Sequence, residues 1–303
     1  QKENNIMKFR NIPIDANCTY DFVVLNSCTY SNPNGDPDFD NQPRRNPETG
    51  CGEITNDCLK RKIRDRIIQL AEMGEIDTEK NKIFIQPEIY LNAITDQVAD
   101  MFPATDKKSK VDSVSAVNYM LNHFYDVRMF GAVLSTGKMK DTNAHVTGAV
   151  QISYGVSEDP IYIRQTKCVR NAHTTEARGE NAGGEFATKP VVEFGLYKAF
   201  GRYMACQGKK NAVTDEDLAL LFETICSMYD NDLSACRNGM CTEKLIVFKH
   251  GNERAIGSLK KYADRVKIEK VNDEDYPHSM DDYKISVNME NMPKDVEIFA
   301  IDL

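Results

Sequence analysis

The 303-residue sequence lacks the features of membrane and secreted proteins. No apolar run approaches the roughly 20 residues that a membrane-spanning helix requires. The first ten residues are polar and charged, so we expect no signal peptide there. There is also no internal repeat and no low-complexity tract. With 41% hydrophobic and 28% charged residues, the composition is typical of a soluble globular protein, and we expect a cytoplasmic location.

Patterns that would indicate a disulfide framework, a metal site or a catalytic centre are missing as well. Nine cysteines are an odd number for disulfides, and none stands at metal-ligand spacing from a second cysteine or histidine pair. The five histidines are scattered, without a neighbouring nucleophile and acid. Residues 131–138 are similar to a phosphate-binding loop, but five residues separate the glycines and Met139 follows the lysine. We therefore predict no catalytic residue, no metal and no cofactor.

The net charge of −8 is distributed unevenly along the chain. Such a charge alone disfavours nucleic acid as a partner. However, residues 44–66 contain seven basic and four acidic residues, and residues 160–210 contain nine basic and four acidic ones. From Asp264 to the end there are eleven acidic and five basic residues. This segregation permits a positive groove on an acidic protein, although ordinary solvated faces would have the same pattern.

Hydrophobic periodicity predicts alternating strands and helices. We expect strands at 20–29, 146–154, 161–169, 195–205, 244–248, 266–271, 283–289 and 296–301. Helices are expected at 55–73, after an N-cap at Thr55, beyond a second N-cap at Thr214, and at 255–264. Without its insertion and extension, this order is βαββαβ, the split arrangement of ferredoxin-like and RRM domains. The predicted fold class is therefore α+β.

The expected organisation is one interrupted domain followed by an extension. An RRM-like domain covers residues 18–250, with an insertion at 74–144 and a hairpin at 169–193. Residues 251–303 form an acidic C-terminal extension, which we expect to pack on this domain or on a neighbouring subunit. If it faces a neighbour, its deletion would shorten an assembly and leave the monomer folded.

Basic side chains gather on the first helix and the turn before it. Lys60, Arg61 and Arg64 form one edge of the helix, close behind the turn that carries Arg44 and Arg45. Such side chains can hold consecutive phosphates without reading the bases. We therefore predict an RNA-binding edge here.

The hairpin adds a second group of candidate RNA ligands. Arg170, His173 and Lys189 supply positive or titratable side chains, and Phe186 is the one aromatic residue at the tip. An apolar side chain at a basic tip suits a wedge between unstacked bases, but packing on the hairpin itself would explain it equally well. No RNP-type aromatic motif occurs, so we do not expect the sheet face to bind RNA.

Several segments, taken in order, resemble one protein family. They are Asp21-Phe-Val-Val, Asn32-Pro-Asn-Gly-Asp-Pro37, Pro47-Glu-Thr-Gly50, Cys58-Leu-Lys-Arg-Lys-Ile-Arg64, Asp126-Val-Arg-Met-Phe-Gly131, Thr147-Gly-Ala-Val-Gln151, Thr174-Thr-Glu176, Gly183-Gly184 and Gly195-Leu-Tyr-Lys198. The chain from about residue 20 to residue 248 is similar to the CRISPR-associated, crRNA-binding backbone subunit of type I Cascade. Within the repeat-associated mysterious protein superfamily, it most resembles the subtype I-C branch.

The resemblance implies a fold and a function. The fold is a palm of modified RRM type, with the insertion as a finger and the hairpin as a thumb. Copies of the subunit polymerise along crRNA, grip its phosphates and present its bases to target DNA without cutting it. The implied partners are crRNA, target DNA, other copies, a large subunit and a crRNA-processing subunit.

The resemblance also assigns roles to individual residues. The phosphate-gripping positions match Lys60 and Arg64, with Arg61 beside them, and Arg128 lies in another matching segment. Residues 183–189 match the thumb tip, with Phe186 as the base wedge. The subtype often has an arginine where this chain has Thr188, so one expected positive charge is missing.

Two other functions remain open from the sequence. Related backbone subunits of type III complexes cleave target RNA with a thumb aspartate and a metal ion. Residues 169–193 contain no aspartate, only Glu176, Glu180 and Glu185, which argues against such an endonuclease. The second alternative is a single-strand RNA-binding module that works alone.

Overall fold

The computed structural model describes residues 8–104, 110–170, 185–272 and 276–303. The strands are β1 (Lys8–Phe9), β2 (Ile12–Pro13), β3 (Tyr20–Ser31), β4 (Gly35–Asp36), β5 (Gln42–Pro43), β6 (Cys51–Ile54), β7 (Gly131–Val133), β8 (His145–Thr147), β9 (Val150–Ile152), β10 (Gly155–Pro160), β11 (Ile163–Arg170), β12 (Glu185–Tyr203), β13 (Met240–His250), β14 (Val266–Lys270), β15 (Tyr283–Val287) and β16 (Val296–Asp302). The α-helices are α1 (Asn56–Glu72), α2 (Leu91–Met101), α3 (Ser113–His123), α4 (Tyr125–Phe130), α6 (Ala205–Lys210), α7 (Asp215–Ser227) and α8 (Leu259–Ala263). Within these ranges, no helix combines the length and apolar composition that crossing a membrane would require.

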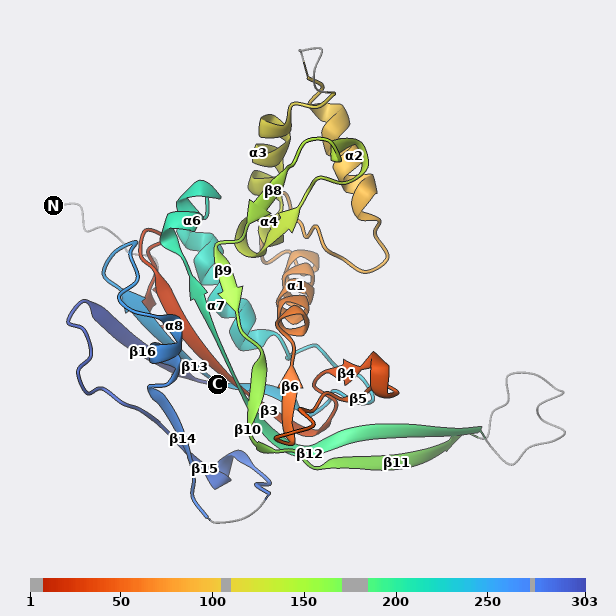
Figure 1. Ribbon diagram of the computed structural model, residues 1–303, viewed down its shortest axis with the longest axis vertical. Coiled ribbons are helices and arrows are strands. Elements are labelled where there is room, and N and C mark those ends of the chain that lie inside the picture. The colour runs from red at the N-terminus through yellow and green to blue at the C-terminus, as the bar shows by residue number, and fades with distance from the viewer. Residues whose placement is uncertain (1–7, 105–109, 171–184, 273–275) are drawn as a thin grey trace, which may run out of the picture.

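An eight-stranded antiparallel sheet forms the body of the molecule (Figure 1). Its strand order is β16-β13-β3-β12-β10-β6, and β9 and β11 also pair with β12. Strand β3 lies near the centre, between β13 and β12. The fold class predicted from the sequence, α+β, agrees with this sheet and the helices packed against it.

Both faces of the sheet are covered. On β3, Phe22 and Val24 belong to the hydrophobic core under α1 and α7, whereas Val23 and Leu25 belong to a second core on the opposite face. The continuous apolar run from Phe22 to Leu25 is therefore explained, because a strand buried on both sides has no need for alternation with polar residues.

Helices α1 and α7 cover the first face, and both begin where the sequence predicts. The Thr55 side chain accepts a hydrogen bond from the backbone N–H of Cys58 at 3.2 Å. Thr214 and Asp217 form a complete capping box at the start of α7. The stripe of Leu59, Ile63, Ile67 and Leu70 on α1 is buried as expected.

The C-terminal extension covers the second face of the sheet. Strand β16 pairs with β13 over its full length, and α8 and the β14–β15 hairpin pack against the sheet. Tyr262, Val266 and Tyr283 share a core with Val23 and Phe248. Since the extension is part of both the sheet and the core, we no longer expect its removal to leave the monomer folded.

The insertion forms a small helical unit next to the sheet. Helices α2, α3 and α4 surround a hydrophobic cluster of their own, which includes Val98, Met120, Leu121 and Leu134. In Figure 1 this unit rises above the end of α1. It therefore has an independent core while remaining attached to the body through α1 and α4.

Some strand boundaries differ from those predicted. Residues 146–154 do not form one strand: β8 pairs with β7, whereas β9 pairs with β12. The break lies at Gly148, where an added Cβ would be 2.3 Å from the backbone of Phe130. Strand β10 was not predicted because its sequence, Gly-Val-Ser-Glu-Asp-Pro, is largely polar and ends in proline.

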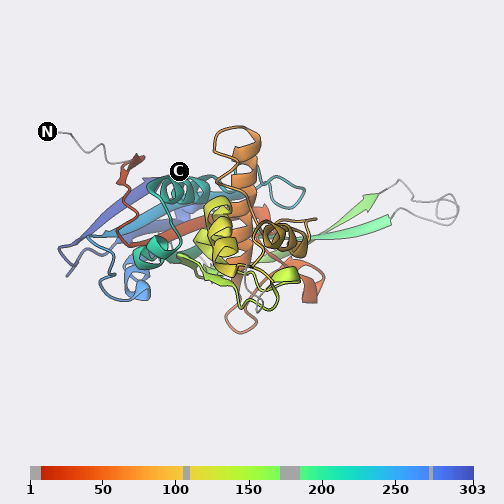
Figure 2. The ribbon, with the colours of Figure 1, turned by 90° about the horizontal axis from the view of Figure 1, so that it is seen from above.

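Strand β12 is much longer than the predicted 195–205 segment. Its first part pairs with β11 and its later part pairs with β3, so one 19-residue strand belongs to both the hairpin and the sheet. Figures 1 and 2 show the resulting ribbon of β11 and β12 projecting away from the body. The predicted tip at 171–189 lies mostly outside the described residues.

Candidate nucleic-acid interface

The turn that carries Arg44 and Arg45 is attached to the start of α1. The Oδ1 atom of Asn34 accepts hydrogen bonds from the backbone N–H and the hydroxyl of Thr55, at 2.9 and 3.0 Å. The backbone N–H of Arg44 donates to the carbonyl of Asn34 at 2.9 Å. Strand β5, just before Arg44, also packs beside β12. The turn, α1 and the root of the hairpin are therefore close together.

The two arginines of this turn differ in whether they form an ion pair. The Arg44 guanidinium lies 3.5 Å from the carboxylate of Asp36 and is partly covered. Arg45 is exposed, and no described carboxylate forms an ion pair with it. Arg45 is thus the one of the two that is available for a phosphate.

Arg64 points into the protein. It is buried, and its Nε donates to Oδ2 of Asp126 at 2.8 Å. Asp126 also accepts hydrogen bonds from the backbone N–H groups of Phe84 and Ile85, at 2.7 and 3.0 Å. A buried pair with this many hydrogen bonds holds α1, α4 and the start of the insertion together.

Arg61, three residues earlier, also forms an ion pair and a hydrogen bond, but its side chain is partly exposed. It forms an ion pair with Asp65, one helical turn away, at 2.6 Å. Its Nη1 donates to the backbone carbonyl of Ile85 at 2.7 Å. Two arginines of the predicted RNA-binding edge therefore secure the same segment of the insertion.

Arg128 is the most fully hydrogen-bonded of the predicted RNA ligands. Its Nε and Nη2 donate to the two carboxylate oxygens of Asp217, at 3.0 and 2.5 Å. It also donates to the carbonyl of Lys80 and to Oδ1 of Asn81, at 2.8 and 2.9 Å. Because both partners of the ion pair are buried, this contact joins the insertion to the start of α7.

Lys60 is the cation of α1 that lacks a carboxylate partner within the described part of the chain. Its ammonium lies 5.8 Å from the centre of the Phe130 ring. Burial lowers the pKa of Lys60 below that of an exposed lysine, while Asp57 acts in the opposite direction. A half-buried ammonium without an acidic partner is well suited to an incoming anion.

The strand register sorts the hairpin side chains onto two faces. Thr166 pairs with Lys189, so Lys189 lies on the same face as Arg164, two residues from Thr166. Lys167 pairs with Thr188 on the opposite face. Arg164 lies 3.5 Å from Glu193, whereas neither Lys167 nor Lys189 has an ion pair among the residues that the structure describes.

Three predicted hairpin ligands cannot be placed as side chains. His173 lies outside the described residues, as do the side chains of Arg170 and Phe186. The backbone of Arg170 pairs with Glu185, and that of Phe186 pairs with Val169. Sequence reasoning had not named Arg164 and Lys167 as ligands, although the alternation of residues along β11 could have identified them.

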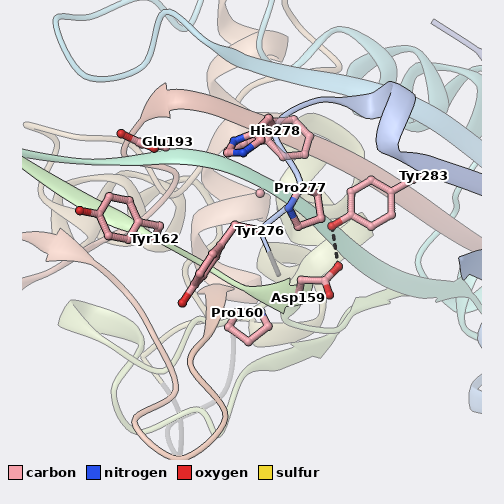
Figure 3. A pocket seen from close by; sticks show the side chains of 10 residues that line it. Asp159, Pro160, Tyr162, Glu193, Tyr276, Pro277, His278 and Tyr283 are labelled. Atoms are coloured by element: carbon pink, nitrogen blue, oxygen red, sulfur yellow. Dashed lines mark hydrogen bonds between the residues drawn. The ribbon is translucent and has the colours of Figure 1, made fainter. Parts of the chain in front are cut away.

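The root of the hairpin is fastened to the C-terminal extension (Figure 3). The Tyr283 hydroxyl donates to Oδ2 of Asp159 at 2.6 Å, and Lys270 lies 3.3 Å from the same carboxylate. The rings of Tyr162 and Tyr276 meet edge to face, with their centres 6.2 Å apart. Burial raises the pKa of Tyr283, and its bond to Asp159 raises it further.

Comparison with known proteins assigns the chain to a family. The family model of the CRISPR-associated protein Cas7 matches residues 18–288. The chain belongs to the Cas7 family. The CRISPR-associated protein Cas7 of Haloferax volcanii is 28% identical over 183 residues, which are 56% of this chain and 52% of that protein. The chain thus matches about half the length of that curated Cas7 relative.

Two solved structures are similar in outline to this Cas7-family chain. One comes from a "CRISPR RNA-guided surveillance complex, pre-nicking", with 13% identity, a TM-score of 0.48, and coverage of 79% of this chain and 80% of the other. The second comes from a "CRISPR RNA-guided surveillance complex", with 11% identity, a TM-score of 0.44, and coverage of 79% and 72%. Both TM-scores are below 0.5, so neither likeness bears on function.

No group of three or more His, Cys, Asp or Glu side chains is arranged as a metal site in the described portion of this Cas7-family chain. Two buried acidic residues near the interface, Asp126 and Asp217, instead form ion pairs with Arg64 and Arg128. The geometry therefore offers cations for binding an anion along α1 and the hairpin.

Proposed function

We propose that this chain is a non-catalytic backbone subunit of a type I CRISPR surveillance complex in the cytoplasm. Copies polymerise along crRNA, grip its phosphates and present its bases for pairing with target DNA. The observation that carries this proposal is the Cas7-family match across residues 18–288. The ordered segments from Asp21 to Lys198 favour the subtype I-C branch. A large subunit and a crRNA-processing subunit complete the proposed assembly.

We further propose that the body is an RRM-like palm, with the insertion as finger and the β11–β12 hairpin as thumb. The order β13-β3-β12-β10 supports this, because it corresponds to strands four, one, three and two of the split βαβ arrangement. Since the extension covers the sheet face opposite α1 and α7, RNA is proposed to run past α1 and the hairpin.

The proposed phosphate ligands are Lys60, Arg45, Lys167 and Lys189, because each lacks a carboxylate partner within the described residues. Arg44, Arg61 and Arg164 are partly engaged and add to the local positive charge. For Arg64 and Arg128 we propose a structural role, since both are committed to buried aspartates. Arg170, His173 and Phe186 keep the ligand and wedge roles that the family resemblance implies.

The assembly itself can be tested on a sizing column. We expect the purified protein to remain small without RNA and to elute as a series of larger complexes with guide RNA. Adding complementary RNA and magnesium should produce no cuts. Regularly spaced cuts would instead support the endonuclease alternative, and a single one-to-one complex would support the stand-alone module.

Replacing Lys60 by Ala should weaken RNA binding for every guide sequence alike. A phosphate contact carries no base information, and its loss reduces the slope of log affinity against log salt by about 0.7 for a single strand. The measurement is a salt titration with two unrelated guides. Lys261→Ala, which removes an exposed lysine from α8 on the opposite face, is the matched control and should change neither quantity. Loss for one guide alone would contradict a backbone grip.

A further inference from the structure

Two cations of α1 approach the same aromatic ring, that of Phe130 at the end of α4. The Lys60 ammonium lies 5.8 Å from the centre of the ring, and the Arg64 guanidinium lies 5.2 Å from it. The charge of Arg64 is compensated by its buried ion pair with Asp126. Lys60 has no such partner among the residues that the structure describes, so the ring is the group against which its ammonium rests.

The surroundings of Phe130 leave its ring little freedom to move away. The ring belongs to the main hydrophobic core and is only 7% exposed. Gly131, the next residue, has a φ of 81°, and a Cβ on it would be 2.5 Å from the carbonyl oxygen of Val146. A Cβ on Gly148 would collide with the backbone of Phe130 itself. Because only glycine fits at these close approaches, the crossing of the two segments fixes the backbone from which the ring extends.

A ring face can support an ammonium without neutralising it. The negative face of an aromatic ring attracts a cation, whereas a carboxylate in the same place would compete with an incoming phosphate. Burial removes part of the hydration of the Lys60 ammonium and lowers its pKa, Asp57 raises it, and Arg64 lowers it. A lysine side chain that is already held in place also loses less conformational entropy when it binds an anion. The contact with Phe130 therefore prepares Lys60 for a phosphate.

We propose that Phe130 is a positioning residue, whose ring holds the Lys60 ammonium where it meets an RNA phosphate. This inference rests on the proposed function and deepens it, because it explains how a long and flexible side chain is directed at the RNA. The ring is too deeply buried to stack on a base. Its contribution to RNA binding therefore acts entirely through Lys60.

The test is a double-mutant cycle on the full chain, measured as the affinity for two unrelated guide RNAs. Phe130→Leu keeps an apolar side chain in the core but removes the ring face, so we expect the affinity to fall by roughly 2- to 30-fold. In a Lys60→Ala background, the same substitution should cause no further loss. Phe124→Leu is the matched control, because that ring is equally buried and no cation of the described residues lies over it. It should leave the RNA affinity unchanged.

Fluorinated analogues of Phe130 give a second measurement that does not depend on the folding of the leucine variant. Successive fluorine atoms withdraw electrons from the ring face while changing its size very little. The RNA affinity should therefore fall stepwise, while the urea midpoint of the RNA-free protein stays constant.

Three results would count against the inference, and each has a different meaning for the proposed function. If Phe130→Leu lowers the affinity equally in the wild-type and Lys60→Ala backgrounds, the ring acts independently of Lys60 and the proposed function stands. If fluorination leaves the affinity unchanged, the ring face does not hold the ammonium, and the proposed function again stands. If the wild-type protein binds no RNA, the proposed function fails and the inference fails with it.

Discussion

A chain that ends at His250 is expected not to fold. The extension supplies β16 to the sheet and buries Tyr262, Val266, Tyr283, Val296 and Ile301. Burying a large apolar side chain contributes about 1.5–3 kcal/mol, so these five amount to roughly 7–15 kcal/mol. That sum is comparable to the whole stability of a typical domain, about 5–15 kcal/mol. Circular dichroism and sizing of the truncated chain would measure the result.

A single substitution in the extension tests the same contribution to stability without removing the whole segment. Tyr262→Ala should lower the free energy of unfolding by about 3–5 kcal/mol, because it leaves a cavity under α8. Urea unfolding of the RNA-free monomer measures the change. Met289→Ala, on the exposed surface of the same extension, should stay within about 0.5 kcal/mol of the wild type. If the chain that ends at His250 unfolds cooperatively at nearly the urea concentration of the wild type, the prediction that the extension is required for folding is wrong.

Replacing Arg128 by Ala is expected to destabilise the protein severely even without RNA. The substitution would leave the buried carboxylate of Asp217 without its partner, which costs about 3–5 kcal/mol. Lys138→Ala is the matched control, because it breaks an ion pair with Asp100 in which both side chains are exposed. Such an exposed pair contributes little to stability, because solvent and salt screen the two charges. Denaturant unfolding of the two variants should therefore differ clearly.

The same experiment separates the structural role of Arg128 from the RNA-binding role that the sequence suggests. If Arg128 is structural, Arg128→Lys should also lose stability, because an ammonium cannot reproduce the paired bonds of the guanidinium to Asp217. An RNA ligand would instead tolerate lysine, and Arg128→Ala would lower RNA affinity at unchanged stability. That second pattern would refute the structural assignment.

The sequence predicted those helices and strands whose formation is determined by residues close together in the chain. The caps at Thr55 and Thr214, the buried stripe of α1 and the apolar run of β3 were all found, since each follows from nearby residues. Strand β10 was missed because its polar sequence is held by pairing with β12 and β6, which lie far away in the chain. Tertiary pairing overrides strand propensity in such cases.

The candidate site could be predicted only as a set of cations. Arg64 and Arg128 look like Lys60 in the sequence, yet their partners Asp126 and Asp217 lie 62 and 89 residues further along. Such distant pairing leaves no local signal. The acidic composition of the extension likewise led to the expectation that the monomer could fold without it. Its few buried side chains are spread over some 40 residues between charged ones, so they leave no clear hydrophobic pattern.

The hydrogen bond between Tyr283 and Asp159 attaches the C-terminal extension to the root of the hairpin. In a polymer of identical subunits, the angle at which each one reaches forward sets the step between them. In the assembly that we propose, this contact at the root of the hairpin would therefore help to set how many nucleotides each subunit spans, although it lies away from the proposed phosphate ligands.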